Sequence, residues 1–296
     1  MSIEELEQLR KKAVQALLIG FFIPFIVGII ITAAAGNIAF IVLFLVLSIA
    51  VSALAQRKPN KLYKKEFKNK FVLGSLKTIF TDLVYEPDHG LNSLVVRSAG
   101  MTTADRYSSN DFISGKYKDI KVIQADVCIE EEHERRDKDG NVEKYYVTIF
   151  EGRWMVFDFN KEFKANMQIR EKGFYGAKAK RWGEDKYHKV KMEDVQFNKE
   201  FTILAQNEHD AFYILTPRMM ERVRQLNANL NGKIFLSFVG NKLHIGLHNG
   251  KDSFECSIFR KIDEQKINEE VSREIKIITD CVDELNLDND LFRKEV

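Results

Sequence analysis

Residues 13–56 read AVQALLIGFFIPFIVGIIITAAAGNIAFIVLFLVLSIAVSALAQ and contain no Asp, Glu, Lys, Arg or His. One continuous helix of this length would measure about 65 Å, roughly twice the hydrocarbon thickness of a bilayer. The stretch must therefore fold back, and Ala34-Ala35-Gly36-Asn37 supplies a turn near its middle, because Gly and Asn tolerate the left-handed backbone that ends a helix. The two arms, residues 14–33 and 38–55, are each long enough to cross a membrane. The sequence thus predicts a transmembrane helical hairpin.

A cleaved signal peptide is the alternative interpretation, since Ala33-Ala34-Ala35 resembles a small-residue cleavage site. The apolar segment before that site is about twenty residues long, which exceeds an ordinary signal-peptide core. A second apolar segment also follows at once. We therefore favour the hairpin, with a kink expected at Pro24 inside its first arm.

Both flanks of the hairpin are basic. Arg10-Lys11-Lys12 precede it, and residues 57–70 carry seven Lys and Arg against Glu66 alone. Short flanks rich in Lys and Arg stay on the cytoplasmic side of a membrane, whereas nearby acidic residues count for little. We therefore expect a multi-pass protein with cytoplasmic N- and C-termini.

The net charge of +2 conceals a segregation along the chain: residues 1–84 carry +6 and residues 85–296 carry −4. This distribution suits a membrane surface and argues against a nucleic-acid partner, which would require a basic face on the folded domain. Cys128, Cys256 and Cys281 lie far apart and form no C-x-x-C pair. Such a set is typical of reduced thiols in a cytoplasm and indicates neither a disulfide framework nor a zinc site.

Residues 57–84 predict a basic amphipathic helix beside the membrane. Pro59 suits a first helical turn, and aromatic residues recur every four positions, with lysines on the other faces. Lysines near an anionic bilayer contribute about 1 kcal/mol each. We assign an anionic-lipid contact to Arg57, Lys58, Lys61, Lys64, Lys65, Lys68, Tyr63, Phe67 and Phe71. In the alternative, the lysines only set the topology and the aromatic residues pack on the domain.

Residues 85–260 predict a cytosolic α+β domain of mainly antiparallel strands, with a long exposed loop at 171–190. Apolar runs separated by turn residues predict three hairpins: 120–129 with 144–150, 153–159 with 163–169, and 197–205 with 211–215. Thr216-Pro217 begins a helix that ends before Gly232. Residues 234–239, 242–247 and 253–259 predict a three-stranded meander.

An amphipathic helix is expected within residues 261–296, because apolar residues from Val271 to Leu285 alternate spacings of four and three. Two heptads are too few for a coiled coil, so we expect this helix to pack on the sheet and not to dimerise. The predicted organisation is a tail (1–12), the hairpin (13–56), the basic helix (57–84), the domain (85–260) and the C-terminal helix (261–296).

No catalytic, cofactor-binding or metal-ligating residue can be assigned. Residues 137–141 resemble the opening of a calcium loop, but Val142 stands where Gly is needed and Thr148 where Glu is needed. His244 and His248 lie four apart on a predicted strand, and a metal site with Cys256 is a weaker alternative. No nucleophile elbow, phosphate-binding loop, dinucleotide fingerprint or kinase signature is present.

These absences favour a non-catalytic binding or scaffolding module held at a membrane. A membrane-bound hydrolase with an unrecognised active site is the alternative function, based on the acidic residues and histidines around residues 171–190.

Several short segments occur in an order that resembles a known family. They are FTDLVYEP (80–87), DFISG (111–115), IFEG (149–152), FNKEF (197–201) and AFYILTP (211–217). Together with the apolar hairpin, they resemble the bacterial membrane proteins of domain-of-unknown-function family 3137. The resemblance implies a bacterial inner-membrane protein with a cytosolic α+β domain and, since such proteins are often encoded near LemA-type membrane proteins, a LemA-type partner. It implies no reaction and no cofactor.

Overall fold

The computed structural model describes residues 1–101, 105–136, 138, 140–158, 166–174, 187–285 and 287. The chain divides into two compact units. The first combines Met1–Ser75 with Phe254–Ser272, and the second combines Leu76–Ser253 with Arg273–Val296. Two long apolar helices precede a domain of antiparallel sheet with a few helices, which confirms the predicted α+β class.

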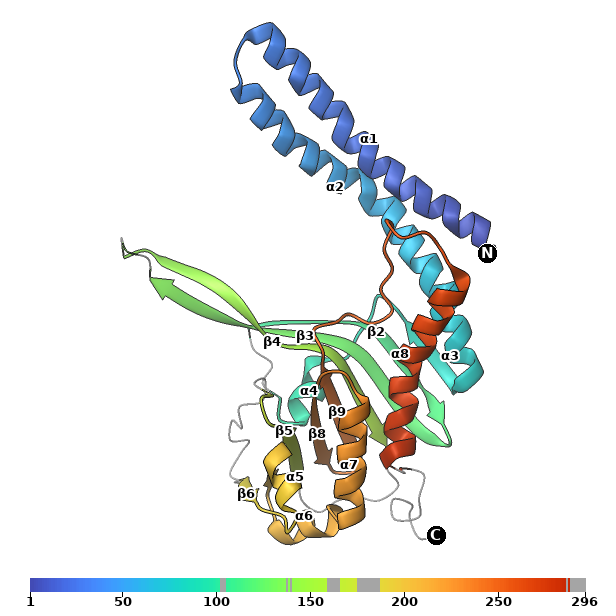
Figure 1. Cartoon of the computed structure of the whole chain (residues 1–296), viewed down its shortest axis with the longest axis vertical. Helices are drawn as coiled ribbons and strands as arrows, with labels where there is room; N and C mark the ends of the chain where they lie inside the picture. The colour runs from blue at the N-terminus through green and yellow to red at the C-terminus, as the bar shows by residue number, and fades with distance from the viewer. Residues whose placement is uncertain are drawn as a thin grey trace. The chain divides into compact units, whose positions relative to one another are not determined.

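The predicted hairpin consists of helices α1 (Ile3–Ala35) and α2 (Ala39–Phe67), which run antiparallel (Figure 1). Ser2 caps α1, because its side chain accepts a hydrogen bond from the Glu5 amide at 3.1 Å. Gly36 ends α1 in the left-handed conformation, with φ 64°, and its amide donates to the Thr32 carbonyl at 2.9 Å. The turn therefore lies where the sequence predicted it.

Small residues bring the two helices close together. A Cβ atom on Gly28 would lie 2.3 Å from the Cβ of Phe44, and one on Gly20 would lie 2.9 Å from the Cα of Ser52. Glycine at such positions lets helix backbones approach each other within a membrane. Both helices are long and apolar enough to cross a membrane.

The helices extend beyond the predicted spans. Residues 3–12, expected to be a separate tail, form the first turns of α1, and Pro59, expected to begin a helix, lies inside α2. A five-residue π-helical turn, Lys68–Val72, then joins α2 to α3 (Leu73–Ile79). The end of the predicted basic helix is instead strand β1 (Thr81–Glu86), because its backbone pairs with the next strand along the chain.

The second unit is built on one nine-stranded sheet in which all pairings between described strands are antiparallel. The strand order is β1-β2-β3-β4-β9-β8-β5-β7-β6. After β1, the strands are β2 (Arg106–Tyr117), β3 (Ile120–Arg136), β4 (Val142–Asp158), β5 (Met167–Glu171), β6 (His188–Val190), β7 (Phe201–Ala205), β8 (Lys233–Val239) and β9 (Lys242–His248). The helices are α4 (Ser93–Ser98), α5 (Val195–Glu200), α6 (Glu208–Ile214), α7 (Pro217–Asn229) and α8 (Glu264–Leu285).

Strands β3 and β4 confirm the first predicted hairpin and are longer than expected. Their outer ends, beyond the pairings of β3 with β2 and of β4 with β9, form a two-stranded ribbon (Figure 1). Residues 137 and 139 of its turn lie outside the described residues. Strands β8 and β9 confirm two strands of the predicted meander.

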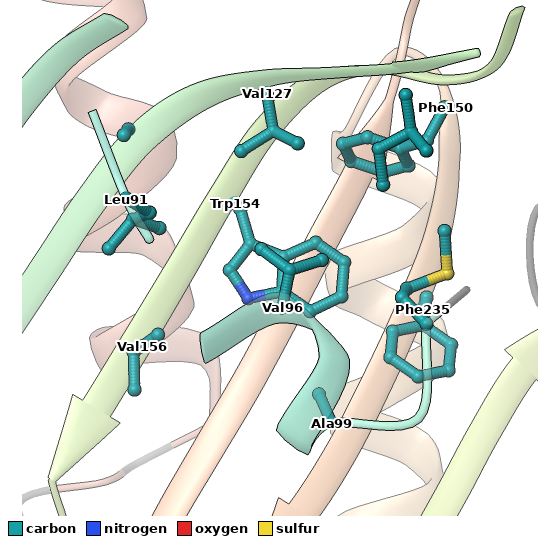
Figure 2. Packing of buried hydrophobic residues seen from close by; sticks show 11 residues of the cluster. Leu91, Val96, Ala99, Val127, Phe150, Trp154, Val156 and Phe235 are labelled. Carbon is teal, nitrogen blue, oxygen red and sulfur yellow. The ribbon is translucent and has the colours of Figure 1, made fainter. Parts of the chain in front are cut away.

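The core of the sheet is centred on Trp154, which is fully buried. Its labelled neighbours are Val96 of helix α4, Val127, Phe150, Val156 and Phe235 (Figure 2). On helix α8, Ile275, Ile278 and Val282 are fully buried, and Cys281 Sγ lies 4.0 Å from Met155 Sδ of β4. The C-terminal helix therefore packs on the sheet, as predicted.

Two predicted hairpins are wrong. Strand β4 ends at Asp158 and does not pair with β5, which lies instead between β7 and β8; residues 159–165 lie outside the described residues. The expected strands at 197–205 and 211–215 are α5, β7 and α6. Asp194 and Asn207 cap the two helices, and the same residue types also favour turns, so their presence did not distinguish the two structures.

The third strand of the predicted meander, at 253–259, is absent from the described residues. Phe254 has a positive φ of 57°, which an extended strand does not accommodate. The Ser253 amide donates to a carboxylate oxygen of Asp126 and not to a neighbouring strand. The proposed long loop at 171–190 begins after β5 and ends in β6, and residues 175–186 lie outside the described residues.

Candidate functional site

The open end of the hairpin is held by a segment from much later in the chain, residues 254–262, which we call the strap. Arg10 Nη1 of α1 donates to the Ile258 carbonyl at 2.5 Å, and Arg10 Nε donates to Glu7 at 2.8 Å. On α2, Lys64 and Lys68 both pair with Glu255. The strap therefore contacts both helices of the hairpin through charged groups.

Aromatic residues of α2 lie under the strap and not at the surface. Tyr63 is 1% exposed and Phe67 is 5% exposed, and their ring centroids lie 6.2 Å apart. A cavity of about 130 Å³ separates them from the strap and the start of α8; its lining includes Cys256, Ile262 and Ile267. The strap thus covers the aromatic stripe of α2.

Burial and charge tune the titratable groups of the strap. Burial raises the pKa of the Cys256 thiol to about 12, so that this thiol is protonated and unreactive near neutral pH. Burial also disfavours the charged form of Glu255, but the hydrogen bond from Lys64 and the positive charge of Lys68 outweigh it and hold the pKa of Glu255 below its ordinary value. Glu255 is therefore a fixed negative charge between two lysines.

The nine residues assigned to an anionic-lipid contact separate into two sets. Tyr63, Phe67, Phe71 and Lys68 are buried, so the expectation that the aromatic residues contact lipid does not agree with the structure. Periodicity alone could not reveal this, because the strap that covers Tyr63 and Phe67 lies about 190 residues later in the chain. Lys64 is half-buried and paired with Glu255. The remaining four are exposed, and we call them the exposed basic group: Arg57, Lys58, Lys61 and Lys65.

The second unit contains a buried charge network at the junction of β3, β4 and α8. Asp126 and Arg153 are paired across β3 and β4 and are 2% and 1% exposed. Asp126 accepts hydrogen bonds from the Ser253 amide at 2.7 Å and from its hydroxyl at 2.8 Å. Arg153 Nη2 donates to Ser253 Oγ and to a Glu274 carboxylate oxygen, both at 2.7 Å, and Nη1 donates to the Glu274 carbonyl.

Two further carboxylates lie beside this network. Ligand oxygens of Asp111, Asp126 and Asp252 all lie within 4.8 Å of one another, and these three form the one such group of potential metal ligands among the described residues. Asp111 has a φ of 53° and accepts hydrogen bonds from Tyr85 at 2.6 Å and Asn110 at 3.0 Å. Three carboxylates at this spacing are chemically suited to a divalent cation.

The protein itself already satisfies most of these oxygens. Burial raises the pKa of Asp126 to about 7, against the opposing charge of Arg153 and the hydrogen bonds from Ser253, while the charge of Asp111 adds to the rise. A carboxyl group with such a pKa can act as a proton carrier near neutral pH. At 2% exposure, however, Asp126 is an interior group. The two hydrogen bonds from Ser253 give it a structural role, because they join β3 to the segment that follows β9.

Sequence reasoning did not single out this network. Its members lie more than 100 residues apart in places, so no spacing joins them. The available signal was that Asp126 lies directly before the apolar residues 127–129 and Arg153 directly before the apolar residues 154–157. Charged residues at such positions are almost never buried unless they are paired.

The histidines considered as metal ligands have other roles in the sheet. His244 is buried, which lowers its pKa to about 4, and its Nδ1 lies 3.4 Å from the indole nitrogen of Trp154. His248 Nδ1 accepts a hydrogen bond from the Glu151 amide at 3.0 Å. Cys256 belongs to the other unit, and the described residues do not bring these three together as a ligand group.

Comparisons with known proteins identify a family model and a solved structure. No curated protein matches the chain. A solved structure described as the crystal structure of the mycobacterial trehalose monomycolate transport factor A, TtfA, is similar, with 10% sequence identity and a TM-score of 0.38, over 76% of this chain and 94% of that chain. The model of a family described as protein of unknown function (DUF3137) matches residues 148–287. The matched family is the one that the order of the sequence motifs predicted.

Proposed function

We propose that this chain is a bacterial inner-membrane protein that crosses the membrane twice and presents a cytosolic, non-catalytic binding or scaffolding domain at the membrane surface. The observation that carries this proposal is the surface of the hairpin. Residues 13–56 contain no ionisable side chain, and large apolar side chains point outward, with Ile23 59% and Ile30 62% exposed. A contiguous apolar surface of this size is stable in lipid and unfavourable in water.

The orientation follows from the charges at the two ends of the hairpin. Arg10-Lys11-Lys12 and the exposed basic group flank it, and the Gly36-Asn37 turn carries no charge. Positively charged flanks remain on the cytoplasmic side. Both flanks, and hence the second unit, are therefore assigned to the cytoplasm.

The titratable groups of the second unit favour binding over catalysis. Asp126, Arg153 and His244 are buried and bonded to groups of the same unit, which supports a role in stabilising the sheet. The hydrolase alternative is supported by the raised pKa of Asp126 beside Asp111 and the exposed Asp252. It would require substrate to reach a carboxyl group that is 2% exposed.

The topology is tested by thiol labelling. Asn37→Cys places a thiol in the hairpin turn, and Val142→Cys places a matched exposed thiol in the second unit. In cells with an opened outer membrane and an intact inner membrane, we expect a membrane-impermeant maleimide to label only Asn37→Cys. Val142→Cys should react once the inner membrane is opened. Equal labelling of both thiols in intact cells would reject the two-span topology.

The family resemblance supports a LemA-type membrane protein as a partner of the scaffolding domain. Affinity capture of the full chain from solubilised membranes should enrich such a protein. The matched control is the hairpin alone, residues 1–75, which should capture none. Equal recovery with the hairpin alone would place any contact in the membrane, and no recovery with either would reject this partner while leaving the anchoring proposal intact.

A further inference from the structure

The strap presents an aromatic and basic tip, Phe259-Arg260-Lys261, on its outer side. Ile258 is buried, whereas Phe259 is 72% exposed, the largest exposed fraction among the exposed aromatic side chains of the described residues. The Phe259 amide donates to Ser257 Oγ at 3.2 Å, so a side chain of the strap bonds to the backbone of the tip. Leaving a phenyl ring in water forgoes about 1.5 to 3 kcal/mol of burial energy.

The level of the tip along the hairpin is set by Arg10. Its guanidinium donates to the Ile258 carbonyl at 2.5 Å, so the tip begins one residue from that contact. Arg10 precedes Ala13, the first residue of the uncharged stretch, by about 4.5 Å along the helix axis. On α2, Tyr63, which lines the cavity beneath the strap, follows Gln56 by about 10 Å.

These distances correspond to the headgroup layer. The hydrocarbon core of a bilayer is about 30 Å thick and the whole bilayer about 40 to 45 Å, which leaves about 5 to 8 Å for headgroups on each side. The tip begins beside Arg10, about 5 Å beyond the uncharged stretch, and therefore lies at the level of the headgroups, where aromatic rings and basic side chains are favoured.

The charges near the tip select the kind of lipid. Arg260 and Lys261 are exposed, and Arg260 Nη2 lies 2.9 Å from Glu270. The exposed basic group of α2 belongs to the same unit and adds four positive charges near the same end of the hairpin. A positive surface beside an exposed aromatic ring is complementary to an anionic bilayer surface.

We propose that Phe259-Arg260-Lys261 is a second membrane contact, in which the Phe259 ring enters the headgroup boundary of an anionic bilayer and Lys261 contacts the lipid phosphates. The proposal rests on the proposed function, because it requires the hairpin to span the bilayer. It assigns to the strap the aromatic contact that the sequence pattern had suggested for α2. The chain would thus leave the membrane within α2, after Gln56, and return to its surface about 200 residues later.

Depth-dependent fluorescence quenching tests this contact in the full chain reconstituted into vesicles. Phe259→Trp introduces a reporter at the tip, and the signal of the native tryptophans is subtracted with the unsubstituted chain. Glu4→Trp is the matched control, since Glu4 is exposed in the same unit and lies about 9 Å further from the uncharged stretch than Arg10. We expect anionic lipid brominated near the headgroup to quench Phe259→Trp, with a blue shift, and to leave Glu4→Trp unquenched.

A third variant separates failure of this contact from failure of the anchor. Phe22→Trp reports from an exposed position within the first span and should be quenched by lipid brominated deep in the acyl chain. If Phe22→Trp is quenched and Phe259→Trp is not, the tip does not contact lipid, and this result overturns the proposal. The exposed tip would then be a candidate contact for a protein partner. If neither is quenched, the hairpin does not span the bilayer. Adding Lys261→Gln to Phe259→Trp should reduce its quenching in anionic vesicles, and unchanged quenching would refute the assigned lysine contact.

Discussion

Replacing Arg153 with Met tests the buried charge network most directly. The substitution keeps a long unbranched side chain but removes the guanidinium that joins β4 to α8. Arg153 is 1% exposed and donates to Ser253 Oγ and to Glu274, so both groups lose this donor in the variant. The buried Asp126 carboxyl is then left without its positive neighbour.

The expected loss follows from these contacts. Removing one partner of a buried ion pair costs about 3 to 5 kcal/mol, because the remaining charge is uncompensated. Two side-chain hydrogen bonds from a charged donor, at about 1.5 to 3 kcal/mol each, lead to a similar range. We therefore expect Arg153→Met to lower the free energy of unfolding by about 3 to 5 kcal/mol at pH 8.

The loss should depend on pH. The pKa of Asp126 is raised from 3.8 to about 7 in the folded state, so its contribution to stability is complete below pH 4 and is lost as the pH rises to about 7. This contribution amounts to about 4 kcal/mol. Removing the Arg153 charge raises the pKa of Asp126 further. At pH 5.5 the carboxyl group is mainly protonated in both proteins, so the difference between them should be smaller than at pH 8.

Urea unfolding of the full chain in detergent, followed by the fluorescence of the buried Trp154, measures both effects. Arg135→Met is the matched control, because Arg135 forms an exposed pair with Glu143 on the β3–β4 ribbon and its loss should change stability by less than about 1 kcal/mol. A loss for Arg153→Met as small as that of the control would refute the reasoning. A loss independent of pH would show that Asp126 does not titrate between pH 5.5 and 8.

Three further predictions concern the hairpin and the boundaries of the second unit. Gly28→Ala should lower the thermal midpoint of the full chain in detergent, since a Cβ atom has no room there, whereas Gly74→Ala, which meets nothing within 4 Å, should leave it unchanged or raise it. A fragment that begins at Leu76 should fold as a monomer and withstand more urea than one that begins at Tyr85, which lacks most of β1; equal midpoints would show that β1 adds no stability. Replacing the exposed basic group with Gln should reduce the preference of the full chain for anionic over neutral nanodiscs in a competition assay, because these residues belong to the unit that contains the hairpin. An unchanged preference would show that these residues only set the topology.

Features encoded locally were predictable from the sequence. The hairpin turn follows from Gly36-Asn37 near the middle of a charge-free run that is too long for one membrane-spanning helix. Helix α7 follows from Thr216, whose side chain accepts a hydrogen bond from the Met219 amide at 3.2 Å. The β3–β4 and β8–β9 hairpins join neighbouring strands, so turn residues and alternation were sufficient.

Features that depend on distant pairing were not predictable in the same way. Strand β5 pairs with β7 and β8, and no local signal distinguishes these partners from the preceding strand. Helices α5 and α6 are six and seven residues long, too short for a clear helical period. The strap and the Arg153 network both join residues separated by more than 100 positions, so their chemistry becomes visible only when the fold is known.

The strap has a consequence for the order of events during synthesis. Phe67 leaves the ribosome about 190 residues before the strap that covers it, which corresponds to about 10 to 40 s at 5 to 20 residues per second. Throughout that interval Tyr63 and Phe67 of α2 are exposed apolar side chains, because the strap that covers them has not yet been synthesised. The unit that contains the hairpin is thus the first to be synthesised, but its packing is complete only after the strap has been made. If translation stops within the sheet, the anchored product lacks the strap. Its Tyr63 and Phe67 then remain uncovered and open to quality-control proteases.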